Sequence, residues 1–230
     1  MNEGQQLSYQ GHEVALYPLN YVNITANPWS ANHVVSGVSN SGCWDNGWYQ
    51  SYYRPLYAPF SMTCYYSAGS AGTLGHGQLW VSNDTVWLPG YSEPQYASFM
   101  VLHSNTQYYG QGTSIAQGTH FFDTGEYGLG SGPHVHMILM VGRRTTVFPA
   151  GYNPSSGYNI WYSPNPPGSI ADYFYLTGEP GVGSGGYGGQ NFKTWDLPPE
   201  PPEPPTGNTA LLTAMLERRK RRWKHIVMIS

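Results

Sequence analysis

Short runs of apolar residues alternate with turn-forming residues along most of this chain, and that pattern predicts strands. The runs are rich in β-branched and aromatic side chains, and Gly, Pro, Asn or Ser bound them. Runs of this kind between turn signals are typical of antiparallel sheets. They predict a mainly β protein, an antiparallel β-sheet or sandwich with long loops. The predicted strands are Gln78–Trp80, Thr85–Leu88, Tyr96–His103, Thr119–Phe122, Val135–Val141, Thr145–Phe148 and Tyr158–Tyr162.

The C-terminal part follows a different pattern. Prolines dominate residues 197–207, which predicts a stiff polyproline II linker. Within residues 208–230 apolar side chains recur on one helical stripe beside five consecutive basic residues, which predicts a basic amphipathic helix that anchors the protein. A frayed basic terminus, or contact with a membrane or nucleic acid, is the alternative for this helix. The β domain then spans residues 1–196.

Composition and charge narrow the class of protein. Aromatic residues make up 15% of the chain, enough apolar surface to exclude disorder throughout. With 29 glycines and 19 prolines, a helical bundle is disfavoured. Residues 1–196 carry ten acidic and four basic side chains, so this domain has no basic surface for nucleic acid.

Two further absences in the sequence bear on location. The longest apolar run, Met137–Val141, is far short of the roughly 20 residues of a membrane span. The polar opening Met1–Gln6 does not resemble a signal peptide, so another route is expected if the protein acts outside a cell. Cys43 and Cys64 are too few for a disulfide framework, and whether they pair is left open.

The strongest chemical signal is the segment Gly130–Met140, which reads Gly-Ser-Gly-Pro-His-Val-His before an apolar run. Residues two apart on a strand point to the same face, so His134 and His136 are expected to converge. Such a pair alone is equally consistent with two structural histidines. His12, His76 and His120 belong to no such motif and are expected to hydrogen-bond in turns.

Several motifs, in order along the chain, resemble the lysostaphin-like zinc endopeptidases. Gly130–His136 is similar to the closing Ser-Thr-Gly-x-His-x-His motif of that family, and Phe99–His103 resembles the strand that ends in its other catalytic histidine. The resemblance covers approximately residues 15–196 and implies the antiparallel fold of these peptidases. The remaining matches are Gly112–Gly118, Phe121–Gly125 and, for the phage-endolysin branch, Tyr17–Thr25, His33 and Tyr57–Phe60.

The resemblance implies a zinc ion held by His, Asp and His, with water as the fourth ligand. His33 would be the first ligand and His136 the last, and His103 and His134 would act on the water. The position of the family's aspartate is Asn40, whose neutral amide oxygen is a weaker zinc ligand than a carboxylate. Asp45 or Cys43 would substitute if the loop is rearranged.

The implied function is a phage zinc endopeptidase that cleaves peptidoglycan peptides, as a virion tail-tip lysin or an endolysin. The alternative is a catalytically degenerate module that serves as a structural or wall-binding part of a phage tail. Expected partners are peptidoglycan peptide and, through residues 208–230, other virion or tail proteins. The expected location is the virion or the bacterial cell wall.

Overall fold

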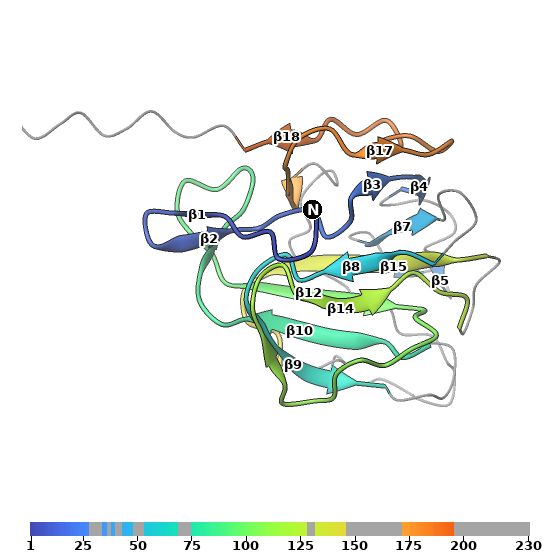
Figure 1. Ribbon diagram of the computed structural model, residues 1–230, viewed down its shortest axis with the longest axis horizontal. Coiled ribbons are helices and arrows are strands. Elements are labelled where there is room, and N and C mark those ends of the chain that lie inside the picture. The colour runs from blue at the N-terminus through green and yellow to red at the C-terminus, as the bar shows by residue number, and fades with distance from the viewer. Residues whose placement is uncertain are drawn as a thin grey trace, which may run out of the picture. The chain divides into compact units, whose positions relative to one another are not determined.

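The computed structural model divides the chain into two compact units, Met1–Trp195 and Asp196–Ser230. The predicted linker and helix at 197–230 lie outside the described residues. Among the described residues no helix is long and apolar enough to span a membrane. The structure describes residues 1–27, 34–35, 38–39, 43–47, 53–68, 75–127, 132–145 and 172–195 (Figure 1).

The mainly β prediction is confirmed, because the described residues form strands and contain no α-helix. The largest element is a seven-stranded sheet in which every neighbouring pair is antiparallel. Its order is β13 (Ser114–Ile115), β9 (Met62–Ser67), β10 (Gln78–Ser82), β12 (Ala97–Leu102), β15 (His134–Val141), β7 (Cys43–Gly47) and β4 (Ile24–Ala26).

Short strands surround this sheet. The pair formed by β8 and β14 lies in front of it in Figure 1 and adds side chains to the same core. The small sheets are β1 (Ser8–Tyr9), β2 (His12–Val14) and β11 (Val86–Trp87); β8 (Pro55–Tyr57) and β14 (His120–Asp123); β3 (Tyr21–Val22) and β17 (Gly181–Val182); β5 (Val34–Val35) and β6 (Val38–Ser39); and β16 (Tyr175–Leu176) and β18 (Lys193–Thr194).

Five of the seven predicted strands are present as β10, β11, β12, β14 and β15, with boundaries that differ by one or two residues. Thr145 lies in no strand, and the rest of that predicted run and all of 158–162 lie outside the described residues. The strands β7 and β9 were not predicted. Cys64 on β9 is a buried free thiol that donates a hydrogen bond to the Tyr66 carbonyl at 3.2 Å.

The central strands β10, β12 and β15 of the large sheet are buried on both faces, which explains their continuous apolar runs. Phe99 and Met137 lie in the principal core, together with the aromatic side chains of β14. Their neighbours Met100 and Ile138 belong to a second apolar cluster on the other face. Alternation along each strand therefore assigns every residue of β12 and β15 to one of two environments.

The register between β15 and its neighbours positions the polar residues. Leu102 of β12 and Asp45 of β7 lie opposite His136 on either side. Trp44 packs into the principal core against Tyr173, with ring centroids 4.9 Å apart. Because Trp44 faces the core, alternation turns Asp45 to the opposite face, where His136 lies.

Candidate metal and catalytic site

Two histidines leave the same face of β15 at its N-terminal end. His134 and His136 are separated by Val135, which is buried in the principal core. The Nδ1 atom of His134 lies 2.7 Å from the Gly132 carbonyl oxygen. A carbonyl only accepts hydrogen bonds, so Nδ1 carries the hydrogen and, in the neutral ring, Nε2 carries the lone pair.

His103 completes a group of three imidazoles. It follows the last residue of β12 with a φ of 84°, so strand alternation does not decide the direction of its side chain. The ring centroid lies 4.7 Å from that of His134 and 6.1 Å from that of His136. Nδ1 of His103 lies 3.0 Å from the Tyr127 carbonyl oxygen and must donate to it, so Nε2 again carries the lone pair.

Close backbone packing holds His103 in this conformation. Its amide donates to the Gly75 carbonyl at 3.0 Å, and its carbonyl accepts from the Tyr127 amide at 3.2 Å. Gly125 runs so near that a Cβ atom there would lie 2.1 Å from the His103 oxygen. A side chain at Gly125 would therefore displace the backbone on which His103 stands.

The environment of His103 favours its neutral form. Burial, and then the neighbouring His136 and His134, lower the pKa of His103 from 6.5 to about 3. At neutral pH the ring is thus uncharged, and its Nε2 atom is able to accept a proton. A buried histidine whose pKa is shifted this far, beside other titratable groups, is typical of functional sites.

A carboxylate joins the group from β7. Oδ1 of Asp45 lies 2.8 Å from Nδ1 of His136, whose side chain is 5% exposed. Two tetrahedral zinc ligands at about 2.0–2.1 Å would be roughly 3.3 Å apart, so this pair fits zinc in chemistry and nearly in spacing. Among the described residues no three His, Cys, Asp or Glu side chains converge on one metal position. The described residues thus bring together two donors of the kind that zinc binds.

Two exposed aromatic residues contact the segments next to His103. Tyr127 stacks on His76, with centroids 5.4 Å apart and planes 25° apart. The Tyr53 hydroxyl accepts a hydrogen bond from the Asn105 side chain at 3.2 Å, and Asn105 accepts from the Glu126 amide at 2.9 Å. Tyr53 and Tyr127 are 50% and 43% exposed, so both rings are available to a bound molecule.

The structure brings together three of the five site residues expected from sequence: His103, His134 and His136. The other two, His33 and Asn40, lie outside the described residues. The partner of His136 is Asp45, which the sequence offered only as a substitute. Alternation about Trp44 is the signal that would have placed Asp45 on the face of the histidines, had the pairing of β7 with β15 been known.

The other three histidines that the structure describes are His12, His76 and His120. His12 Nδ1 lies 2.9 Å from the Thr85 hydroxyl, and His120 Nε2 lies 2.8 Å from Asp123 Oδ1. Both histidines are hydrogen-bonded as predicted, but they lie on strands β2 and β14 and not in turns. His76 instead makes the ring contact with Tyr127 described above.

No protein-family model and no curated protein sequence matches the chain. Solved structures do. The catalytic domain of lysostaphin from Staphylococcus simulans is 17% identical over 52% of this chain and 78% of its own, with a TM-score of 0.38. The catalytic domain of the prophage-encoded M23 protein EnpA from Enterococcus faecalis is 17% identical over 53% and 82%, with a TM-score of 0.39. A zinc-containing peptidase from Vibrio cholerae is 18% identical over 59% and 42%, with a TM-score of 0.41.

Proposed function

We propose that this protein is a zinc-dependent endopeptidase that cleaves peptidoglycan peptides. The observation that carries the proposal is the gathering of His103, His134, His136 and Asp45 at one end of β12 and β15. The choice of peptidoglycan as the substrate rests on the motifs that resemble the lysostaphin-like peptidases, above all Gly130–His136.

The proposed metal ligands are His136, Asp45 and His33. Asp45 supplies the negative charge that Asn40 does not, which offsets part of the 2+ charge of the ion. When bound, zinc lowers the pKa of a coordinated water toward neutrality and polarises the carbonyl of the peptide bond. The resemblance placed the carboxylate at position 40, and the register of β7 favours position 45 instead.

His103 and His134 perform the proton transfers in this proposal. Each ring uses Nδ1 to donate to a backbone carbonyl, so each presents Nε2 as the acceptor. Nε2 of one ring takes the proton of the attacking water and returns it to the nitrogen of the leaving amine. Fixing Nδ1 prevents the rings from turning and keeps Nε2 directed at the reacting atoms.

Zinc content provides the test. Wild-type protein dialysed against zinc and then against buffer is expected to retain about one zinc per chain, measured by mass spectrometry of the metal. Asp45→Asn is expected to weaken zinc binding by more than about 100-fold, because loss of a charge that touches the ion should cost more than the roughly 10–100-fold typical of residues that only orient a ligand. Asp123→Asn is the matched control. Asp123 also pairs with a histidine at 2.8 Å, but this histidine is His120, and both residues lie on β14.

Peptidoglycan hydrolysis completes the experiment. Release of amino groups from purified cell walls should fall at least about 100-fold in His136→Ala and in His103→Ala, and stay unchanged in Asp123→Asn. Wild-type protein that binds no zinc and releases no amines would favour the degenerate module over the enzyme. Higher activity in Asn40→Asp would show that position 40, and not Asp45, carries the missing carboxylate.

The proposed setting is a phage virion, with residues 208–230 as the attachment to other tail proteins. A proline-rich spacer followed by a basic amphipathic helix suits a domain displayed at a distance from a particle. Deletion of residues 197–230 is expected to leave the β domain folded and to abolish incorporation into particles. Particles that retain the truncated protein would contradict this assignment.

A further inference from the structure

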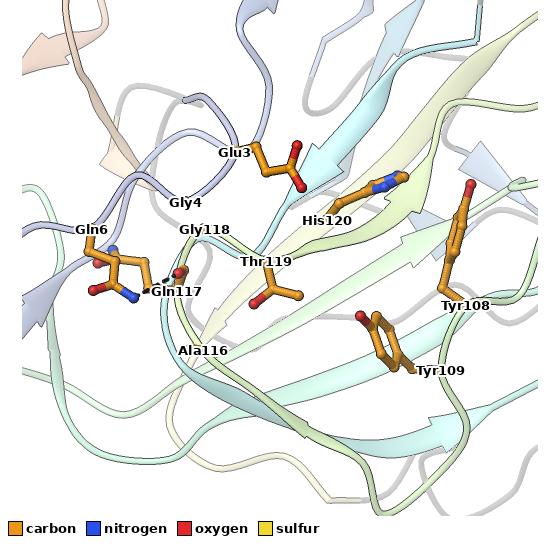
Figure 2. Close-up of a pocket in the computed structure, with 10 residues that line it drawn as sticks. All are labelled: Glu3, Gly4, Gln6, Tyr108, Tyr109, Ala116, Gln117, Gly118, Thr119 and His120. Atoms are coloured by element: carbon orange, nitrogen blue, oxygen red, sulfur yellow. Dashed lines mark hydrogen bonds between the residues drawn. The ribbon is translucent and has the colours of Figure 1, made fainter.

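A pocket of about 480 Å³ opens beside β14, apart from the histidine cluster. Tyr109, which lines it, packs against the principal core, whereas His136 lies on the face of the large sheet that carries the second apolar cluster. The volume falls in the range of roughly 300–1,000 Å³ in which proteins bind small molecules. Figure 2 shows Glu3 and Gln6 on one side of the pocket and the rings of Tyr108, Tyr109 and His120 on the other.

The side formed by the N-terminal segment is held in place by backbone contacts. The amide of Gly4 donates to the Gly118 carbonyl at 2.9 Å, and the amide of Leu7 donates to Oε1 of the buried Gln117 at 2.8 Å. Gly118 has a φ of 82°, and a Cβ atom there would lie 2.6 Å from the Gln5 carbonyl oxygen. Close approach therefore requires glycine here, and the wall exists before any ligand binds.

The aromatic side is equally organised. Tyr108 and His120 are in ring contact, with centroids 4.6 Å apart. Asp123 holds both of them: it accepts a hydrogen bond from the Tyr108 hydroxyl, and its Oδ1 lies 2.8 Å from Nε2 of His120. Tyr109 packs edge-on against the buried Trp80 at 6.3 Å. These contacts fix three ring faces around one space.

The charge of the pocket is negative. Glu3 is exposed and forms no hydrogen bond or ion pair with the residues that the structure describes, and neither Lys nor Arg lines the pocket. Tyr57, whose ring contacts that of His120, also responds to this negative charge. Burial raises the pKa of the Tyr57 hydroxyl above its usual value of 10, and the charges of Glu3 and Asp123 raise it further. Preformed aromatic faces beside an uncompensated carboxylate attract organic cations.

We infer that this pocket binds the ammonium group of an alkylamine, such as a lysine side chain. Glu3 pairs with the ammonium group, and the rings of Tyr108 and Tyr109 pack against it and its alkyl chain. An anionic ligand would face Glu3 without any Lys or Arg in the lining to balance it. This inference is independent of the proposed peptidase activity, because it uses neither the histidine cluster nor zinc.

The probe is Nα-acetyl-lysine methylamide, titrated into the full-length protein labelled with nitrogen-15. Since Glu3 is exposed, the dissociation constant is expected to be on the order of millimolar. Amide signals of Tyr109, Thr119 and His120 are expected to shift and saturate together. Nα-acetyl-norleucine methylamide, which has the same chain without the charge, is expected to leave these signals unchanged.

Two variants locate the interaction. Glu3→Gln is expected to weaken the lysine probe about three- to fivefold, as for removal of one exposed ion pair. Tyr108→Leu is expected to weaken it to a similar extent through loss of the ring face. Glu93→Gln, at another exposed glutamate, is the control and should not change the affinity.

Several results would overturn the inference. Equal binding of the norleucine compound would show an apolar pocket that does not select charge. Binding of N-acetylglucosamine without binding of the lysine probe would show a sugar site. Unchanged affinity in Glu3→Gln, or lysine-induced shifts only at residues far from Thr119, would place the cation elsewhere.

Discussion

Two groups of buried polar side chains in this protein use their hydrogen-bonding capacity differently. Gln117 is 1% exposed, and both polar atoms of its side chain form hydrogen bonds with the backbone. Its Nε2 donates to the carbonyls of Val14 at 2.7 Å and Pro59 at 2.8 Å, and its Oε1 accepts from the Leu7 amide at 2.8 Å. This amide joins three separate segments and has no atom left for a ligand.

His103 and His134 each use one ring nitrogen for a hydrogen bond and leave Nε2 for the chemistry that we propose. His103 and His134 donate from Nδ1 to backbone carbonyls, and the described residues form no hydrogen bond to either Nε2. Burial, and then the two neighbouring imidazoles, disfavour protonation of His103. The difference indicates that Gln117 serves the fold, and it supports the proposal that the histidines serve a reaction.

The largest expected effect on folding is at Gln117. Gln117→Leu removes the hydrogen bonds to the Leu7 amide and to the carbonyls of Val14 and Pro59, and should lower the free energy of unfolding by about 3 kcal/mol. The Pro59 carbonyl keeps its hydrogen bond from the Leu16 amide at 3.1 Å. Urea denaturation followed by tryptophan fluorescence measures this loss. Gln111→Leu, at an exposed glutamine, is the control. Equal stability of the two variants would mean that the amide network does not support the fold.

The next largest effect is a loss of stability at low pH. An unfolded histidine takes up a proton below about pH 6.5, whereas folded His103 does so only near its pKa of about 3. The unfolded state therefore binds more protons in this interval, and the metal-free protein should lose roughly 2–3 kcal/mol of stability between pH 6.5 and 4. His103→Asn, which tolerates the positive φ, should reduce this loss.

Urea denaturation of both proteins across this pH range, with a chelator present, measures the difference. Parallel pH dependence of the wild type and His103→Asn would contradict the proposal that burial of a neutral His103 costs stability in acid.

The smallest expected effect is at Asp45 in the metal-free protein. In Asp45→Asn the amide oxygen is still able to accept from Nδ1 of His136, so the free energy of unfolding should change by less than about 1 kcal/mol. With zinc present the wild type should gain stability and the variant should not. Thermal denaturation with chelator and with zinc measures both. A loss in the chelated variant as large as that of Gln117→Leu would make Asp45 a structural residue.

The local sequence pattern was sufficient to predict much of the fold. The strands β12 and β15 are long apolar runs between turn signals, so sequence predicted them together with the shared face of His134 and His136. The strand β7 carries Asp45, Asn46 and Gly47, which are poor strand formers, and was not predicted. It forms because it pairs with β15 and because Trp44 enters the core.

Sequence alone thus determined the strand class of the protein and the two histidines of one strand, because both depend on periodicity within a few residues. Tertiary structure decided the contact of Asp45 with His136 across 91 residues, and the approach of His103 through a positive φ. It also assembled the pocket of Glu3 and Tyr108 from segments distant in sequence. Such contacts depend on strand pairing and on packing between distant segments, which no local pattern encodes.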